Sequence, residues 1–134
     1  MPEQTVLMVA NLDTRGAEFA EFKGLVESQG LGALLMDVSM EQEPPFPGDI
    51  TCREVAAAGG LSIEEVRAQY TAERHISTDC MVRGGSVIAA SLFEQGRIDG
   101  IFGAGGATTT IIATSIMKPL HFGVPKVIAT TVAG

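Results

Sequence analysis

The residues of this sequence best suited to chemistry are a run of glycines followed at once by threonines. Gly103, Gly105 and Gly106 come directly after an apolar segment. Thr108 and Thr109 then begin the next apolar stretch, which has helical spacing. Glycine lets a ligand approach the backbone, and the first amides of a helix have no partner within it. Because the helix dipole adds positive charge there, the expected ligand is an anion, most often a phosphate.

This glycine segment matches the known phosphate-binding motifs only in part. Gly103 and Gly105 fit the dinucleotide pattern G-x-G-x-x-G, but its last position is Thr108. The sequence contains no G-x-x-x-x-G-K-[ST], which excludes a Walker-type P-loop. The alternative interpretation is that the glycines only form a turn and the threonines only begin a helix.

A second polar segment, residues 11–16, follows the first apolar run of the chain. Thr14 can donate a hydroxyl hydrogen bond to a phosphate, and Arg15 can bind one through two hydrogen bonds. Asp13 can hold a magnesium ion, and Gly16 completes the candidate loop. The alternative is that Asp13 or Thr14 only caps the following helix.

One further acid belongs to the candidate site, and no catalytic group does. Asp37 ends the second apolar segment, where an acidic side chain can bind the hydroxyls of a ribose, although it is equally compatible with an ordinary loop acid. The sequence shows no nucleophile–base–acid arrangement and no paired carboxylates, so it supports binding better than catalysis. With only His75 and His121, a histidine-based metal site is not expected.

The order of apolar segments predicts the fold that positions these residues. Continuous apolar runs, typical of buried parallel strands, alternate with segments of helical spacing. We therefore expect an α/β, Rossmann-like three-layer sandwich with at least four parallel strands in the order 2-1-3-4. In that order the loops 11–16 and 103–109 lie side by side at the point where the strand order reverses. The expected strands are residues 5–10, 33–38, 99–103 and 126–130. The expected helices are one that ends near residue 28, one at 51–58, a short one that begins after Ser62, and two at 78–94 and 108–117.

Three further segments have a place in this scheme. Residues 39–49, with three prolines and two glutamates, form a loop that acts as a lid, a partner contact or a plain surface excursion. Residues 75–79 are expected to be a connector. Gly84 and Gly85 lie inside a predicted helix, where they mark either its true start or a close packing contact.

Length, charge and cysteine content bound the class of protein. The 134 residues suit one domain, and an end directly after a strand suggests the amino-terminal part of a longer, two-subdomain protein. The net charge of −7 argues against binding to nucleic acid or anionic membranes. Cys52 and Cys80 are not spaced as a metal or redox pair, and no signal segment is recognisable, so we expect reduced thiols and a cytoplasmic location.

Four segments taken together resemble the family of the tomato mosaic virus resistance protein. They are residues 11–16, Arg83-Gly84, residues 103–106 and residues 123–127. The resemblance covers only the amino-terminal portion of that family's unit. It implies a dimeric ATP-binding domain of two Rossmann-like halves. The residues it carries over as nucleotide-site candidates are Asp13, Thr14, Arg15, Gly16, Gly103, Gly105 and Gly106.

These observations lead to three functional hypotheses. The first is a homodimeric nucleotide-binding domain that binds ATP, alone or with Mg²⁺, and holds the phosphates of ATP with the 11–16 and 103–109 loops. The second is a protein-interaction module with a vestigial pocket. The third is an enzyme that acts on a phosphorylated or carboxylate small metabolite. The sequence does not decide whether the protein is an enzyme.

Overall fold

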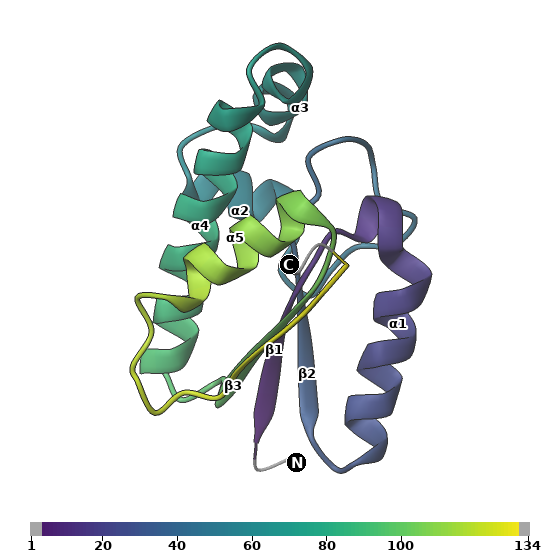
Figure 1. The fold of residues 1–134 in the computed structure, drawn as a ribbon, viewed down its shortest axis with the longest axis vertical. Helices are drawn as coiled ribbons and strands as arrows, with labels where there is room; N and C mark the ends of the chain where they lie inside the picture. Colours follow the sequence, from purple (N-terminus) through teal and green to yellow (C-terminus); the bar gives the residue numbers. More distant parts are fainter. Residues whose placement is uncertain (1–3, 132–134) are drawn as a thin grey trace.

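The computed structural model describes residues 4–131, which form one parallel sheet with helices on both faces (Figure 1). The strands are connected by helices in every case, as the alternating apolar segments predict. In chain order the elements are β1 (Thr5–Ala10), α1 (Leu12–Ser28), β2 (Gly32–Asp37), α2 (Cys52–Ala58), α3 (Ile63–Ala72), α4 (Arg74–Glu94), β3 (Gly100–Gly105), α5 (Ala107–Met117) and β4 (Lys126–Thr130).

The strand order is β2-β1-β3-β4, and all three pairs are parallel. This order confirms the predicted α/β sheet and its predicted arrangement. At the centre, Val9 of β1 lies opposite Met36 of β2 and Gly103 of β3. Because the order reverses at β1, the chain leaves β1 and β3 toward opposite faces, so the helices that follow these neighbouring strands begin on either side of one crevice.

Each face of the sheet has its own apolar core. On one face, buried residues of β1, β2 and β3, such as Leu7 and Ile101, pack against α2, α4 and α5. On the other face, Met8 and Leu35 pack against α1, mainly through Leu12 and Phe19. Figure 1 shows the two layers, with α1 on one side of the strands and α4 and α5 on the other. Burial on both faces explains why β1 and β2 read as continuous apolar runs.

Helix α1 begins earlier than predicted. Residues 12–16, expected to be part of a loop, form its first turns, with a local departure from helical geometry at Arg15 (φ −131°, ψ 30°). The start is fixed by tertiary structure, because the amide of Leu12 donates to the carboxylate of Asp37, 25 residues away. A partner so distant in the chain leaves no signal in the local sequence.

Helix α4 also begins before its predicted start. The expected connector at residues 75–79 is wrong, because α4 starts at Arg74. Ser77 is buried there and donates a hydrogen bond from its hydroxyl to the carbonyl of Val66 in α3, at 2.6 Å. This hydrogen bond joins the first turn of α4 to α3. It stabilises the start of α4, which has no capping side chain.

Gly84 and Gly85 lie well inside α4, so the close-packing alternative is the correct one. A Cβ on Gly84 would lie 1.9 Å from the carbonyl oxygen of Val55 in α2. A Cβ on Gly85 would lie 2.5 Å from Cδ1 of Ile116 in α5. The glycine pair therefore lets α4 pack directly against both neighbouring helices.

The proline-rich segment after β2 returns to the edge of the sheet. Ile50 donates its amide to Leu35 and accepts the amide of Asp37, which extends the pairing of β2 by one bridge. Asp49 accepts hydrogen bonds from the Leu35 amide and from the amino group of Lys23 in α1. The carboxyl-terminal end of the segment is thus fixed on the edge strand of the sheet and on α1.

Candidate functional site

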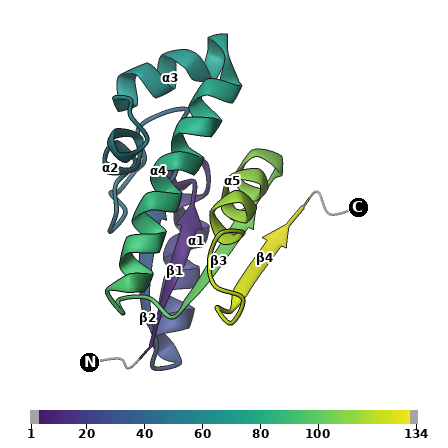
Figure 2. The same cartoon turned by 90° about the vertical axis from the view of Figure 1, so that its left-hand side faces the viewer.

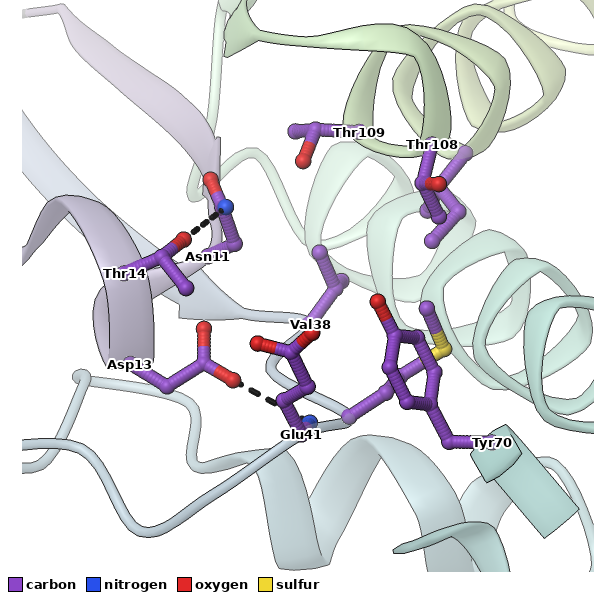
Figure 3. A pocket seen from close by; sticks show the side chains of 10 residues that line it. Asn11, Asp13, Thr14, Val38, Glu41, Tyr70, Thr108 and Thr109 are labelled. Carbon is purple, nitrogen blue, oxygen red and sulfur yellow. Dashed lines mark hydrogen bonds between the residues drawn. The ribbon is translucent and has the colours of Figure 1, made fainter. Parts of the chain in front are cut away.

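A cavity of about 100 Å³ lies at the carboxyl ends of β1 and β3, at the crevice where the strand order reverses. Figure 3 shows side chains from four parts of the chain converging on it. They come from the start of α1, the segment after β2, the end of α3 and the start of α5. The lining residues are Asn11, Asp13, Thr14, Val38, Met40, Glu41, Tyr70, Thr108, Thr109 and Ile112.

The start of α5 forms one wall of this cavity. Its N-cap residue is Gly106, and no side chain caps the helix. The first intrahelical bond runs from the amide of Thr110 to the carbonyl of Gly106. The amides of residues 107–109 therefore have no acceptor within the helix, and the structure gives them none elsewhere in residues 4–131. With Thr108 and Thr109 beside them, they present hydrogen-bond donors to a ligand.

The start of α1, on the opposite side of the crevice, is already closed by the protein itself. The amide of Leu12 donates to Oδ1 of Asp37 at 3.1 Å, and the amide of Asp13 donates to Oγ of Ser39 at 3.0 Å. These are the donors that a phosphate would need at this helix. The two helix starts therefore differ, and only the start of α5 keeps its donors available.

Asp37 holds this closed arrangement from within the protein. Its carboxylate is fully buried, and Oδ1 accepts the amides of Leu12 and Ser39 and the hydroxyl of Ser39. Burial raises the pKa of the Asp37 carboxyl, and the hydrogen bonds from Ser39 and Leu12 oppose that rise only in part. Asp37 does not line the cavity, so the structure gives no support to its expected contact with a ribose.

Asp13 lines the cavity and also fixes the segment that closes it. Its Oδ2 accepts the amides of Glu41 and Gln42 at 3.1 and 3.3 Å, and the Gln42 side chain donates to the Asp13 carbonyl. Next to it, Thr14 accepts a hydrogen bond from the side-chain amide of Asn11 (Figure 3). The side-chain oxygen of Asn11 is buried and has no partner among the described residues, so it can accept a hydrogen bond from a bound group.

Two residues that the sequence reasoning missed, Glu41 and Tyr70, complete the cavity. Burial raises the pKa of the Tyr70 hydroxyl, and its hydrogen bond to the Glu41 carboxylate raises it further. Arg74 lies 4.2 Å from the centre of the Tyr70 ring, which fixes the ring at the edge of the cavity. Glu41 comes shortly after β2, and this position after a strand is a weak indication of a binding residue. Nothing in the sequence indicates that α3, which carries Tyr70, reaches the end of the sheet.

Arg15 and Gly16 lie away from this cavity. Arg15 forms an ion pair with Glu18 at 3.0 Å and lines a separate hollow on the α1 side of the sheet. Gly16 is buried, and a Cβ on it would lie 3.1 Å from Cγ of Pro45. The structure thus brings Asp13 and Thr14 together with Thr108 and Thr109, and it places Arg15 and Gly16 elsewhere.

The three glycines of the β3–α5 connection serve three different ends. A Cβ on Gly103 would lie 2.6 Å from Cβ of Ala113, so this glycine lets α5 pack on β3. Gly105 has φ +151° and a Cβ there would lie 2.9 Å from Cβ of Thr109, so this position favours glycine. A Cβ on Gly106 would meet nothing within 4 Å. Gly106 is therefore the glycine whose surroundings are open to a ligand.

The described residues carry neither a clustered metal site nor a membrane span. In residues 4–131 no three histidine, cysteine, aspartate or glutamate side chains gather closely enough to hold a metal ion. Over the same range, no helix has the length and apolar character needed to cross a bilayer. Asp13 and Glu41 remain the two carboxylates that face the cavity.

Comparison with known proteins identifies the family. Residues 4–134 match a family model described as the N-terminal domain of an uncharacterised protein family, UPF0261. The chain belongs to the UPF0261 family. It is 34% identical over 128 residues to a UPF0261 protein of Clostridium tetani, and 27% identical over 128 residues to one of Brucella suis. These matches cover 96% of this chain but only 31% and 30% of the relatives, so the chain spans under a third of their length.

This membership corrects the resemblance drawn from the sequence. The segments at residues 11–16 and 103–106 were matched to the tomato mosaic virus resistance family, and that assignment is wrong, because the family model and the curated relatives are those of UPF0261. The glycine and aspartate segments are short, and short motifs of this kind recur in unrelated α/β proteins. The hypothesis of nucleotide binding therefore rests on the geometry of the cavity alone.

Proposed function

We propose that this domain binds the phosphate group of a small molecule at the start of α5, with a nucleotide such as ATP as the preferred ligand. The observation that carries the proposal is the uncapped start of α5 at the crevice of the sheet. Three free backbone amides lie there beside Thr108 and Thr109, on a helix of 11 residues. A helix start of this kind favours an anion through both its amides and its dipole.

The size of the cavity limits which part of the ligand it encloses. Sites that enclose a whole small molecule usually measure about 300–1,000 Å³, whereas this cavity measures about 100 Å³. A phosphate group fits such a space, and the rest of a nucleotide would lie at its mouth. The small volume of the cavity also favours the metabolite hypothesis, in which the ligand is a small phosphorylated or carboxylate molecule.

The acidic wall of the cavity fits a divalent cation better than a bare anion. Asp13 and Glu41 face the donors of α5 across the cavity (Figure 3). Oδ2 of Asp13 is occupied by two amides, which leaves Oδ1 as a ligand. Because Mg²⁺ is commonly held by one or two carboxylates together with phosphate oxygens, we infer that the ligand binds as its magnesium complex.

We also infer a cytoplasmic location for the domain. Cys52 and Cys80 are both free and buried. Unpaired thiols of this kind are common in proteins of reducing compartments.

The test is a calorimetric titration with ATP and magnesium, using the chain and a protein of the relatives' full length. Thr108→Val removes one hydroxyl from the phosphate wall with little change in shape. A hydrogen bond to a charged group contributes about 1.5–3 kcal/mol, so we expect roughly 10–100-fold weaker binding. Thr71→Val, at an exposed position of α3 outside the cavity, is the matched control and should bind like the wild type.

The pattern of binding distinguishes the hypotheses. Binding by both proteins, weakened by Thr108→Val alone, supports a nucleotide site within this domain. Binding of inorganic phosphate or a sugar phosphate, without ATP, supports the metabolite hypothesis. If neither protein binds any of these ligands at millimolar concentration, the phosphate proposal is refuted and the interaction-module hypothesis remains.

A further inference from the structure

One half of the sheet face that carries α1 has no helix over it in residues 4–131. Helix α1 packs on β1 and β2, and it meets β3 edge-to-face where Phe22 contacts Phe102, with ring centres 5.8 Å apart. Beyond that contact lies β4, which Figure 2 shows at the edge of the sheet, on the far side of β3 from β1 and β2. Helix α5 covers β3 and β4 on the opposite face only.

The uncovered surface is apolar. Val127 and Ala129 lie opposite Phe102 and Ala104 in the strand register, so all four side chains share the α1 face. Val127 is 55% exposed, and Ala129 is exposed as well. Parallel sheets occur almost only with both faces covered, so an exposed apolar half-face of this kind calls for a packing partner.

A hollow runs along this surface beside α1. It measures about 200 Å³ and has an apolar floor that includes Phe19, Phe22 and Ala129. Arg15 and Glu18, which pair with each other, form part of its lining. An apolar floor bordered by charges of both signs matches the pattern of an amphipathic helix, whose apolar stripe is flanked by polar residues.

The handedness of the connections restricts which helix can lie there. Right-handed crossovers place the helices between β3 and any strand added beyond β4 on the face of α5. A β–α–β unit that continued directly from β4 would therefore leave the surface around Val127 and Ala129 uncovered. A helix that follows such an added strand can instead return across the sheet and pack next to α1.

We propose that the surface formed by Phe102, Ala104, Val127 and Ala129 is the docking site of a helix from the later part of the same protein, one that follows the next β–α–β unit. The length of the relatives supplies the occupant, because this domain spans only 31% of the Clostridium tetani protein. The docked helix lies beside α1 and completes the second face of the sheet. The domain and the carboxyl-terminal part of the protein are then joined through this surface.

The test is the rate of cysteine labelling in a protein of the relatives' full length. Ala129→Cys places a thiol on the proposed docking surface, and Ala20→Cys places one on an exposed position of α1 as the matched control. Cys52 and Cys80 are buried and remain in place. We expect a maleimide to label position 129 at least 10-fold more slowly than position 20 in the native protein, and at the same rate in urea.

Two results would overturn the proposal. Equal labelling rates at positions 129 and 20 in the native protein would show that nothing covers the surface. Protection at position 129 that disappears on dilution would show that a second copy, and not a helix of the same chain, covers it. Because Ala→Cys is a small change at a surface position, loss of folding is not expected, and circular dichroism checks it.

Discussion

Replacing Asp37 with alanine should destabilise the fold through the start of α1. The substitution leaves the amides of Leu12 and Ser39 buried without their acceptor. Each unsatisfied buried donor costs about 1–3 kcal/mol, and removal of a buried charge offsets part of the loss. We therefore expect the free energy of unfolding to fall by roughly 2–4 kcal/mol, a large part of the usual stability of a domain this size.

The asparagine variant is the informative control for this prediction. Asp37→Asn keeps an oxygen for the two amides and removes only the charge, so its stability should lie within about 1 kcal/mol of the wild type. Urea unfolding followed by circular dichroism at pH 7 measures both variants. An alanine variant as stable as the wild type, or an asparagine variant as unstable as the alanine one, would refute the capping role.

The difference in stability between the wild type and Asp37→Asn should also depend on pH. Because burial raises the pKa of the Asp37 carboxyl in the folded state, its contribution to stability is greatest below the pKa of the unfolded chain, about 3.9. That contribution is lost as the pH rises through the folded-state pKa. The stability of Asp37→Asn relative to wild type should therefore increase from about pH 4 upward and then level off, whereas a constant difference would contradict the raised pKa.

Three further outcomes follow from the packing. Gly103→Ala should destabilise the domain by about 1–3 kcal/mol in thermal or urea unfolding, because its Cβ meets Ala113, and a smaller loss would contradict that contact. Gly106→Ala, in open space, should change stability by less than about 0.5 kcal/mol while weakening phosphate binding in calorimetry. Burial, with a smaller effect of the Asp37 carboxylate, raises the pKa of the Cys52 thiol to about 11, so a thiol reagent at pH 7.5 should label it only after unfolding.

The sheet was predictable because its signals are local and repeated. Continuous apolar runs gave the strands, and their alternation with helices gave a parallel sheet, for which the predicted order 2-1-3-4 is one of several that the alternation allows. The capping box at Ser62 gave the start of α3, since both of its hydrogen bonds involve Glu65, three residues away. These features depend on neighbours in the chain, which a single sequence contains.

The site was predicted only in part because its remaining determinants are distant in the chain. The threonines of α5 and Asp13 were found from their place after a strand, and the structure does bring them to one cavity. The capping of α1 by Asp37 and the approach of Tyr70 from α3 depend on contacts across 25 residues or more. Glycine also has several uses that the sequence does not separate, since Gly103 serves helix packing and Gly106 lies in open space.

Because the start of α1 is closed by Asp37 and Ser39, the two sides of the crevice differ in the backbone amides they offer to a ligand. With the Asp37 carboxyl group closing the start of α1, the free helix-start amides that can anchor an incoming anion are those of α5, so its orientation is set from one side. An anion bound without a metal ion would then be held mainly by the layer of α5, whereas a magnesium complex would also contact Asp13 in the layer of α1. Binding of such a metal-free anion would stabilise the layer of α4 and α5 and slow amide hydrogen exchange there. Hydrogen exchange in α1 would stay as it is in the free protein.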